Sequence, residues 1–140
     1  MFRLKRVWLI HIVALTISNL AFGQLSEVAT DSGTYRGHIS PIDERVTVFQ
    51  GIGYAAPPVG DLRWKPPSPA IPFAGVREAD RVSAACWQAR NSDASVYARG
   101  NLNRSEDCLY LNVFTGAEGS DADLPVMVWF HGGGNTAGHG

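Results

Sequence analysis

A continuously apolar run, Leu124 to Phe130, leads directly into a glycine-rich turn that begins at His131. A strand without polar alternation is typical of a sheet that helices cover on both faces. The sequence between Gln24 and Gly140 shows no long amphipathic helix pattern, so we expect the covering helices to lie beyond Gly140. The predicted fold class is therefore α/β, and this chain is expected to contribute mostly β-strands and loops of an incomplete domain.

Partial alternation of β-branched and aromatic residues predicts further short strands at 33–39 and 45–54, which we expect to be half-exposed and antiparallel. Another strand is predicted from Cys108 to Phe114. The proline-rich segment 55–72 does not suit the interior of a helix or sheet, so it predicts an ordered or extended surface connection. Residues 84–105 are small and polar, which predicts a loop held between the two cysteines.

The turn His131-Gly132-Gly133-Gly134-Asn135 combines backbone donors with an absence of β-carbons. Glycines that follow a strand place N–H groups at the carboxyl edge of a sheet, where no side chain blocks a substrate oxygen. Such donors suit the oxyanion of a tetrahedral acyl-transfer intermediate. The alternatives are a plain turn or a phosphate-binding loop, but neither the Walker pattern nor GxGxxG fits. His131 and Gly132 are expected to support the loop backbone.

The N-terminus has the layout of a secretory signal peptide. A short basic segment precedes an apolar run, Val7 to Leu20, which is followed by small residues. We therefore expect residues 1–23 to be a signal peptide that is cleaved before Gln24, and the mature chain, 24–140, to be secreted or periplasmic. The alternative is an uncleaved anchor, although the run is shorter than the roughly 18 apolar residues of a membrane span, so no stable span is predicted.

The charge of the mature chain argues against binding to nucleic acid. Three of the 12 basic residues and none of the 13 acidic residues precede Gln24, which leaves a net charge of about −4. His131 and His139 flank the turn without a carboxylate or thiol to join them, so we predict no metal site and no cofactor. Asn103 begins a glycosylation sequon that matters only in a eukaryotic source, and its modification stays open.

Cys86 and Cys108 are the only two cysteines of the chain. Both lie in the part that is predicted to be exported, where an even pair is a disulfide candidate. The alternatives are two buried free thiols or a catalytic cysteine. A thiol nucleophile needs a histidine partner, and neither cysteine has an obvious one nearby in the sequence.

Three motifs follow one another along the chain: GIGYAAPPVGDLRWKPP at 51–67, EDCLYLNVF at 106–114 and VWFHGGG at 128–134. Together they resemble the type-B carboxylesterase and cholinesterase family, over about Thr34 to Gly140. The EDCLYLNV run with its upstream cysteine is a specific signature, whereas HGGG alone is shared with other lipases and esterases. Gly116 departs from the family pattern, which usually has Pro, Gln or Arg at that position.

The resemblance implies the N-terminal part of an α/β-hydrolase fold and hydrolysis of small-molecule carboxylic esters by a serine, acid and histidine triad. It also implies roles for residues of this chain: oxyanion donors at Gly133 and Gly134, a disulfide between Cys86 and Cys108, and a buried or half-buried ion pair between Arg63 and Glu106.

No serine of the chain lies in a GxSxG pattern, the strand-to-helix elbow that holds the nucleophile of this family. We therefore predict that the parent protein is a serine carboxylesterase and that this chain, without the triad, is inactive alone. The rival hypothesis is a noncatalytic cholinesterase-like adhesion or binding ectodomain, because the fold also serves surface proteins that have lost their triad. The intact HGGG favours the enzyme, since a binding module has no need for donors aimed at an oxyanion. No oligomeric state is predicted.

Overall fold

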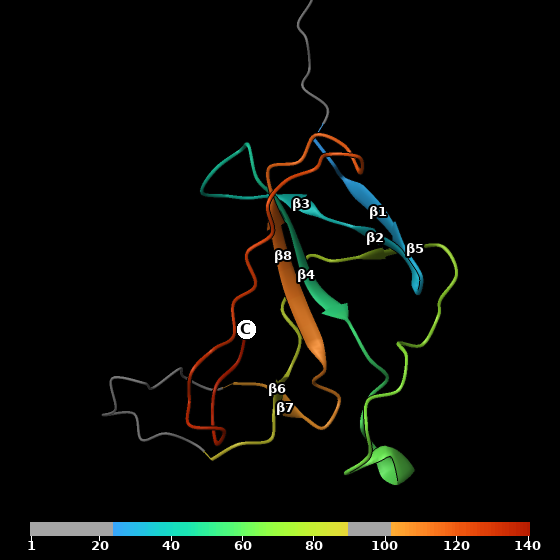
Figure 1. The fold of residues 1–140 in the computed structure, drawn as a ribbon, viewed down its shortest axis with the longest axis vertical. Coiled ribbons are helices and arrows are strands. Elements are labelled where there is room, and N and C mark those ends of the chain that lie inside the picture. Colours follow the sequence, from blue (N-terminus) through green and yellow to red (C-terminus); the bar gives the residue numbers. More distant parts are fainter. Residues whose placement is uncertain (1–23, 90–101) are drawn as a thin grey trace, which may run out of the picture.

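A computed structural model describes residues 24–89 and 102–140 (Figure 1). The predicted signal peptide lies outside the described residues, and so does the centre of the loop between the cysteines. The described elements are β1 (Glu27–Thr30), β2 (Gly33–Arg36), β3 (His38–Ile39), β4 (Thr47–Gly53), the 3-10 helix η1 (Gly60–Leu62), β5 (Val76–Glu78), β6 (Ala85–Cys86), β7 (Arg104–Ser105) and β8 (Tyr110–Thr115).

The strands form three small sheets. β1 and β2 are an antiparallel hairpin with a turn at Asp31 and Ser32, and β5 joins β2 in parallel. The second sheet is antiparallel and has β4 between β3 and β8, with β4 and β8 side by side at the centre of the molecule (Figure 1). β6 and β7 pair in parallel, so that the chain before and after the cysteine-bracketed loop meets at one place.

The strands predicted at 45–54 and from Cys108 to Phe114 are confirmed as β4 and β8, although Thr47, Val48 and Phe49 of β4 are buried and not half-exposed. The strand predicted at 33–39 is instead divided at Gly37 into β2 and β3, which belong to different sheets. The cause is the close passage of the chain over β4, where a β-carbon at Gly37 would lie 2.8 Å from the carbonyl oxygen of Val48. The proline-rich segment is a connection, as predicted, and contains only the single turn of η1.

A bulge in β4 bends the central sheet. The register between β4 and β8 shifts between Phe49 and Ile52. Gly51 lies within the shift with a φ of 73°, in the left-handed region that favours glycine. Its N–H donates to Oδ1 of Asn112 at 3.0 Å, so the asparagine of the EDCLYLN run replaces the ladder hydrogen bond that the bulge removes.

The core lies where the first sheet meets β4. Tyr35, Phe49 and Ala79 are buried and pack together, and the partly buried side chains around them are Val28, Ile52 and Phe73. The rings of Tyr35 and Phe73 meet edge to face with their centroids 5.1 Å apart. This small core fixes the β4–β8 sheet, and the chain after β8 leads to the glycine-rich turn.

The apolar run from Leu124 to Phe130 does not form the paired strand that its composition predicts. It has no strand assignment, and Figure 1 shows it as a plain trace after β8. Met127 and Phe130 are 93% and 84% exposed. Within residues 24–89 and 102–140 no strand pairs with this segment, and an unpaired apolar strand has neither its ladder hydrogen bonds nor its burial.

The described residues contain no helix that is both long and apolar enough to cross a membrane.

Candidate functional site

The candidate site is the glycine loop, which we define as residues 131–138. The carbonyl oxygen of Gly133 is turned into the loop, where it accepts hydrogen bonds from the N–H groups of Thr136 and Ala137 at 3.1 and 3.2 Å. The hydroxyl of Thr136 also donates to it, at 3.0 Å. The N–H groups of Gly133 and Gly134 have no hydrogen-bond acceptor among the described residues, so they remain able to bind a ligand oxygen.

Backbone angles and close contacts favour glycine in this loop. Gly133 has a φ of 139°, Gly134 of 60° and Asn135 of 59°. A β-carbon at Gly133 would collide with the carbonyl oxygen of Ala137, whereas one at Gly134 would meet open space. The two glycines are therefore constrained for different reasons: Gly133 by close approach of the backbone and Gly134 by its left-handed conformation.

His131 lies at the start of the loop, where its Nδ1 is 3.0 Å from the carbonyl oxygen of Gly132. This contact joins the side chain to the backbone of the next residue, and the supporting role of His131 stays a prediction. His139 follows the loop, with its Nδ1 3.2 Å from the carbonyl oxygen of Gly140. In the part of the chain that the structure describes, no cluster of His, Cys, Asp or Glu side chains is suited to hold a metal ion.

An open hollow of about 410 Å³ lies against the glycine loop. The loop forms one side of it, and the segment Cys86, Trp87 and Gln88 forms the other. Trp87 is 70% exposed, so its ring is an apolar surface beside the free N–H groups. A hollow with an apolar wall and a few backbone donors suits a small ligand that carries a carbonyl oxygen.

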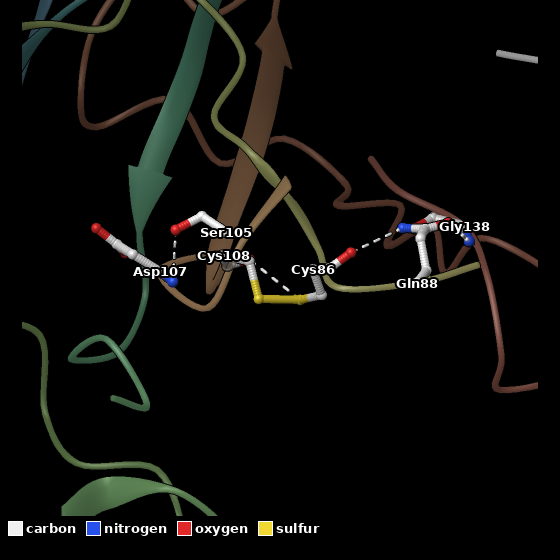
Figure 2. The surroundings of a disulfide bond; sticks show 6 residues. All are labelled: Cys86, Gln88, Ser105, Asp107, Cys108 and Gly138. Atoms are coloured by element: carbon white, nitrogen blue, oxygen red, sulfur yellow. Dashed lines mark hydrogen bonds between the residues drawn. A yellow bond between two sulfur atoms is a disulfide. The ribbon is translucent and has the colours of Figure 1, made fainter. Parts of the chain in front are cut away.

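Gln88 connects the two sides of this hollow (Figure 2). Its Nε2 donates to the carbonyl oxygen of Gly138 at 2.9 Å, and its Oε1 accepts from the N–H of Gly138 at 2.8 Å. The same Nε2 donates to the carbonyl oxygen of Cys86 at 3.1 Å. The sequence predicts no role for Gln88 or Asn112, because each side chain forms hydrogen bonds to a segment far away in the sequence.

Comparison with known proteins assigns this arrangement to a family. The model of the carboxylesterase family matches residues 24–140, which is most of the chain. The chain belongs to the carboxylesterase family. Its relatives include a fumonisin B1 esterase from Sphingopyxis macrogoltabida, which is 41% identical over 76% of this chain and 19% of its own length. A cocaine esterase from Oryctolagus cuniculus is 42% identical over 78% of this chain and 22% of its own length.

The structure of this chain is also similar to solved esterase structures. A PNB esterase matches with a TM-score of 0.69 and 36% identity, over 83% of this chain and 22% of that protein. The described residues are therefore part of an α/β-hydrolase fold. The chain spans about a fifth of the length of the relatives that it matches.

The disulfide that the family resemblance implied is confirmed (Figure 2). Cys86 and Cys108 are joined, with their Cα atoms 5.0 Å apart, and no free cysteine remains. The bond fixes the end of β6 to the start of the segment that leads into β8. The two cysteines are 22 residues apart in the sequence, so the bond removes conformational entropy that the unfolded chain would otherwise retain.

We expect the double replacement of Cys86 and Cys108 by serine to lower the free energy of unfolding by about 3 kcal/mol, because the unfolded chain regains the freedom of the closed loop. Urea denaturation of the full-length protein, with and without the two replacements, measures this difference. The wild type under reducing conditions serves as a second comparison, since it lacks the bond without any change of sequence. Equal midpoints for all three samples would contradict a stabilising bond.

The structure brings Arg63 and Glu106 together in a bidentate pair. The guanidinium Nε and Nη2 donate to Oε1 and Oε2 of the carboxylate, each at 2.6 Å. The two side chains are 54% and 37% exposed, so the pair lies at the surface, less buried than the sequence analysis expected. The reason is that Arg63 follows η1 in the proline-rich connection, which runs over the surface.

The Arg63 guanidinium, through its hydrogen bonds and its charge, holds the pKa of the Glu106 carboxyl below its ordinary value. Because the folded-state pKa is lowered, the pair stabilises the fold fully above the ordinary carboxyl pKa and loses this effect as the pH falls through the lowered one. We expect a double-mutant cycle with Arg63→Met and Glu106→Gln to give a small coupling that shrinks with added salt. A coupling that is unchanged in high salt or at low pH would contradict a surface pair.

Proposed function

We propose that this chain is the N-terminal part of an exported serine carboxylesterase and that its glycine loop forms part of the oxyanion hole. The observation that carries the proposal is the pair of N–H groups at Gly133 and Gly134, which have no hydrogen-bond acceptor among the described residues and lie at a hollow with an apolar wall. Membership of the carboxylesterase family and the esterase relatives support the reaction class. Export is supported by the disulfide, which persists in oxidising compartments, and by the signal-peptide pattern of residues 1–23.

In the proposed reaction, a serine supplied by another part of the protein gives its hydroxyl proton to the histidine of the triad and attacks the ester carbonyl carbon. The carbonyl oxygen then gains negative charge, which the N–H groups of Gly133 and Gly134 stabilise. The alcohol leaves with the proton from the histidine, and water, activated by the same histidine, releases the acid and restores the serine hydroxyl. An oxyanion donor of this kind lowers the barrier by about 3 kcal/mol. The two relatives carry names that refer to different compounds, fumonisin B1 and cocaine, so the proposal for this protein extends to carboxylic esters as a class.

Two assays of the full-length protein test this function. The first is hydrolysis of a chromogenic short-chain ester, and the second is covalent labelling by a fluorophosphonate, which reports an activated serine independently of ester specificity. Turnover together with labelling is the expected result. A folded full-length protein that shows neither would refute the esterase and would favour the noncatalytic binding ectodomain.

A further inference from the structure

Gln88 is the feature of the site that the proposed chemistry leaves unexplained. Among the described residues, it supplies the only hydrogen bonds that reach the glycine loop from outside that loop. Its amide uses both hydrogens of Nε2, one for Gly138 and one for Cys86, and uses Oε1 as an acceptor (Figure 2). This pattern fixes which way the amide points, and neither a carboxylate nor a thioether of similar length reproduces it.

Gln88 forms a link between Cys86 and Gly138, and the Cys86 end of this link is firmly held. Cys86, which accepts one of the hydrogen bonds, is held by its disulfide to Cys108 and by the pairing of β6 with β7. The other end of the link, Gly138, packs back on the start of the glycine loop. A β-carbon at Gly138, whose φ is 128°, would collide with the ring of His131 and come within 2.6 Å of the carbonyl oxygen of Gly132. Any contact that holds Gly138 in place therefore also holds His131 and Gly132, where the glycine loop begins.

We propose that Gln88 is a positioning residue that ties the glycine loop to the Cys86–Cys108 disulfide and thereby sets the direction of the oxyanion donors. The kinetic part of this inference rests on the proposed esterase function, whereas the structural part does not. Gly133 and Gly134 lie between the start of the glycine loop and Gly138. Without the hydrogen bonds of Gln88, the loop would therefore present its N–H groups in a wider range of directions. Small misplacements of a catalytic group lower the rate strongly, and they do so without loss of substrate contacts.

The test uses the full-length protein with Gln88→Met, which keeps the length and removes every hydrogen bond, and Gln88→Glu, which keeps only an acceptor. The carboxylate of Gln88→Glu would also face the carbonyl oxygens of Gly138 and Cys86, which should loosen the tie further. Arg81→Met is the matched control, because Arg81 lies between β5 and β6 and its side chain bonds only to Asp80 among the described residues.

Three measurements are needed: hydrogen–deuterium exchange of the peptide that holds Gly138, the thermal midpoint, and kcat and KM per fluorophosphonate-titrated site. We expect exchange at Gly138 to rise about tenfold in Gln88→Met, which corresponds to the loss of a hydrogen bond, and to rise less in Gln88→Glu, whose carboxylate can still accept from this N–H. The value of kcat per titrated site should fall about tenfold with KM changed less than about twofold. Arg81→Met should match the wild type in all three. A merely structural role would lower the number of titrated sites but not kcat per site.

Unchanged exchange at Gly138 in a folded Gln88→Met protein would overturn the proposal, and so would an unchanged kcat per titrated site in either folded Gln88 variant. If Gln88→Met does not fold, Gln88→Glu decides by kcat per titrated site, which should still fall because its carboxylate cannot donate to Gly138 or Cys86. If the wild type hydrolyses no ester, the proposed function fails, but the exchange data still decide whether Gln88 holds the loop.

Discussion

Valine in place of Gly133 should lower kcat of the full-length esterase by about two to three orders of magnitude and leave KM nearly unchanged. The side chain has no room, because its β-carbon would collide with the carbonyl oxygen of Ala137. The turn closed by the hydrogen bonds of Thr136 and Ala137 to Gly133 would have to open, and the neighbouring donors would move with it. An oxyanion donor acts mainly in the transition state, which is why kcat and kcat/KM should fall together.

Gly134 offers a sharper comparison, because its side-chain position is open and only its φ of 60° restricts substitution. Valine is strained in the left-handed region, whereas asparagine adopts it readily, as Asn135 does next in the chain with a φ of 59°. Gly134→Val should therefore lose about two orders of magnitude in kcat, and Gly134→Asn should retain most of the activity. The difference between these two variants isolates the backbone conformation from simple bulk.

The measurement pairs steady-state kinetics on a chromogenic ester with a thermal melt of each variant, since misfolding would also reduce kcat. Active-site titration then gives kcat per folded enzyme. A folded Gly133→Val or Gly134→Val protein with near-normal kcat would refute the role of these glycines as oxyanion donors. Equal losses in Gly134→Val and Gly134→Asn would show that the space beside Gly134 is not open in the full-length protein.

Local patterns in the sequence predicted several parts of this fold. The alternation at 45–54 identified β4, and the β-branched and aromatic residues after Cys108 identified β8. Both strands follow from side-chain periodicity, which depends only on near neighbours. The disulfide followed from the family resemblance and from the presence of one cysteine pair. The glycine loop was predicted from three consecutive glycines after a predicted strand, because glycines have no β-carbon that would block their N–H groups.

The features that the sequence did not predict depend on contacts between distant segments. β5 is a three-residue strand with exposed side chains, and it exists because β2 offers a free edge. Asn112 becomes informative only when its partner, the bulge at Gly51, is known. Gln88 has no local signature, since glutamine two residues after a cysteine is compatible with any loop. Non-local hydrogen bonds of this kind are invisible to periodicity, because the two partners share no sequence window.

We expect the exposed run from Leu124 to Phe130 to behave differently in the isolated chain and in the full-length protein. Among the described residues it is a continuous apolar segment without a strand partner, of which Val126 and Trp129 are 86% and 82% exposed. Such a segment is a template for strand pairing between molecules. We therefore expect this chain alone to aggregate and to hydrolyse no ester, since it also has no GxSxG serine. Ester turnover by the purified chain, absent from a mock preparation, would contradict this.

Val128→Asp should then make the isolated chain more soluble, because a charge in the middle of the run opposes strand pairing between copies. In the full-length protein we expect this segment to be a covered strand, so the same change should destabilise the fold by about 3 kcal/mol or more through burial of an unpaired charge. Ile42→Asp is the matched control: Ile42 is 95% exposed and lies outside the run, in the turn before β4, so its replacement should have little effect in either setting. Light scattering of the isolated chain and thermal melts of the full-length protein measure the two effects. A full-length Val128→Asp protein that melts like the wild type would mean that the run stays exposed there too, and the covered strand inferred from its composition would have to be abandoned.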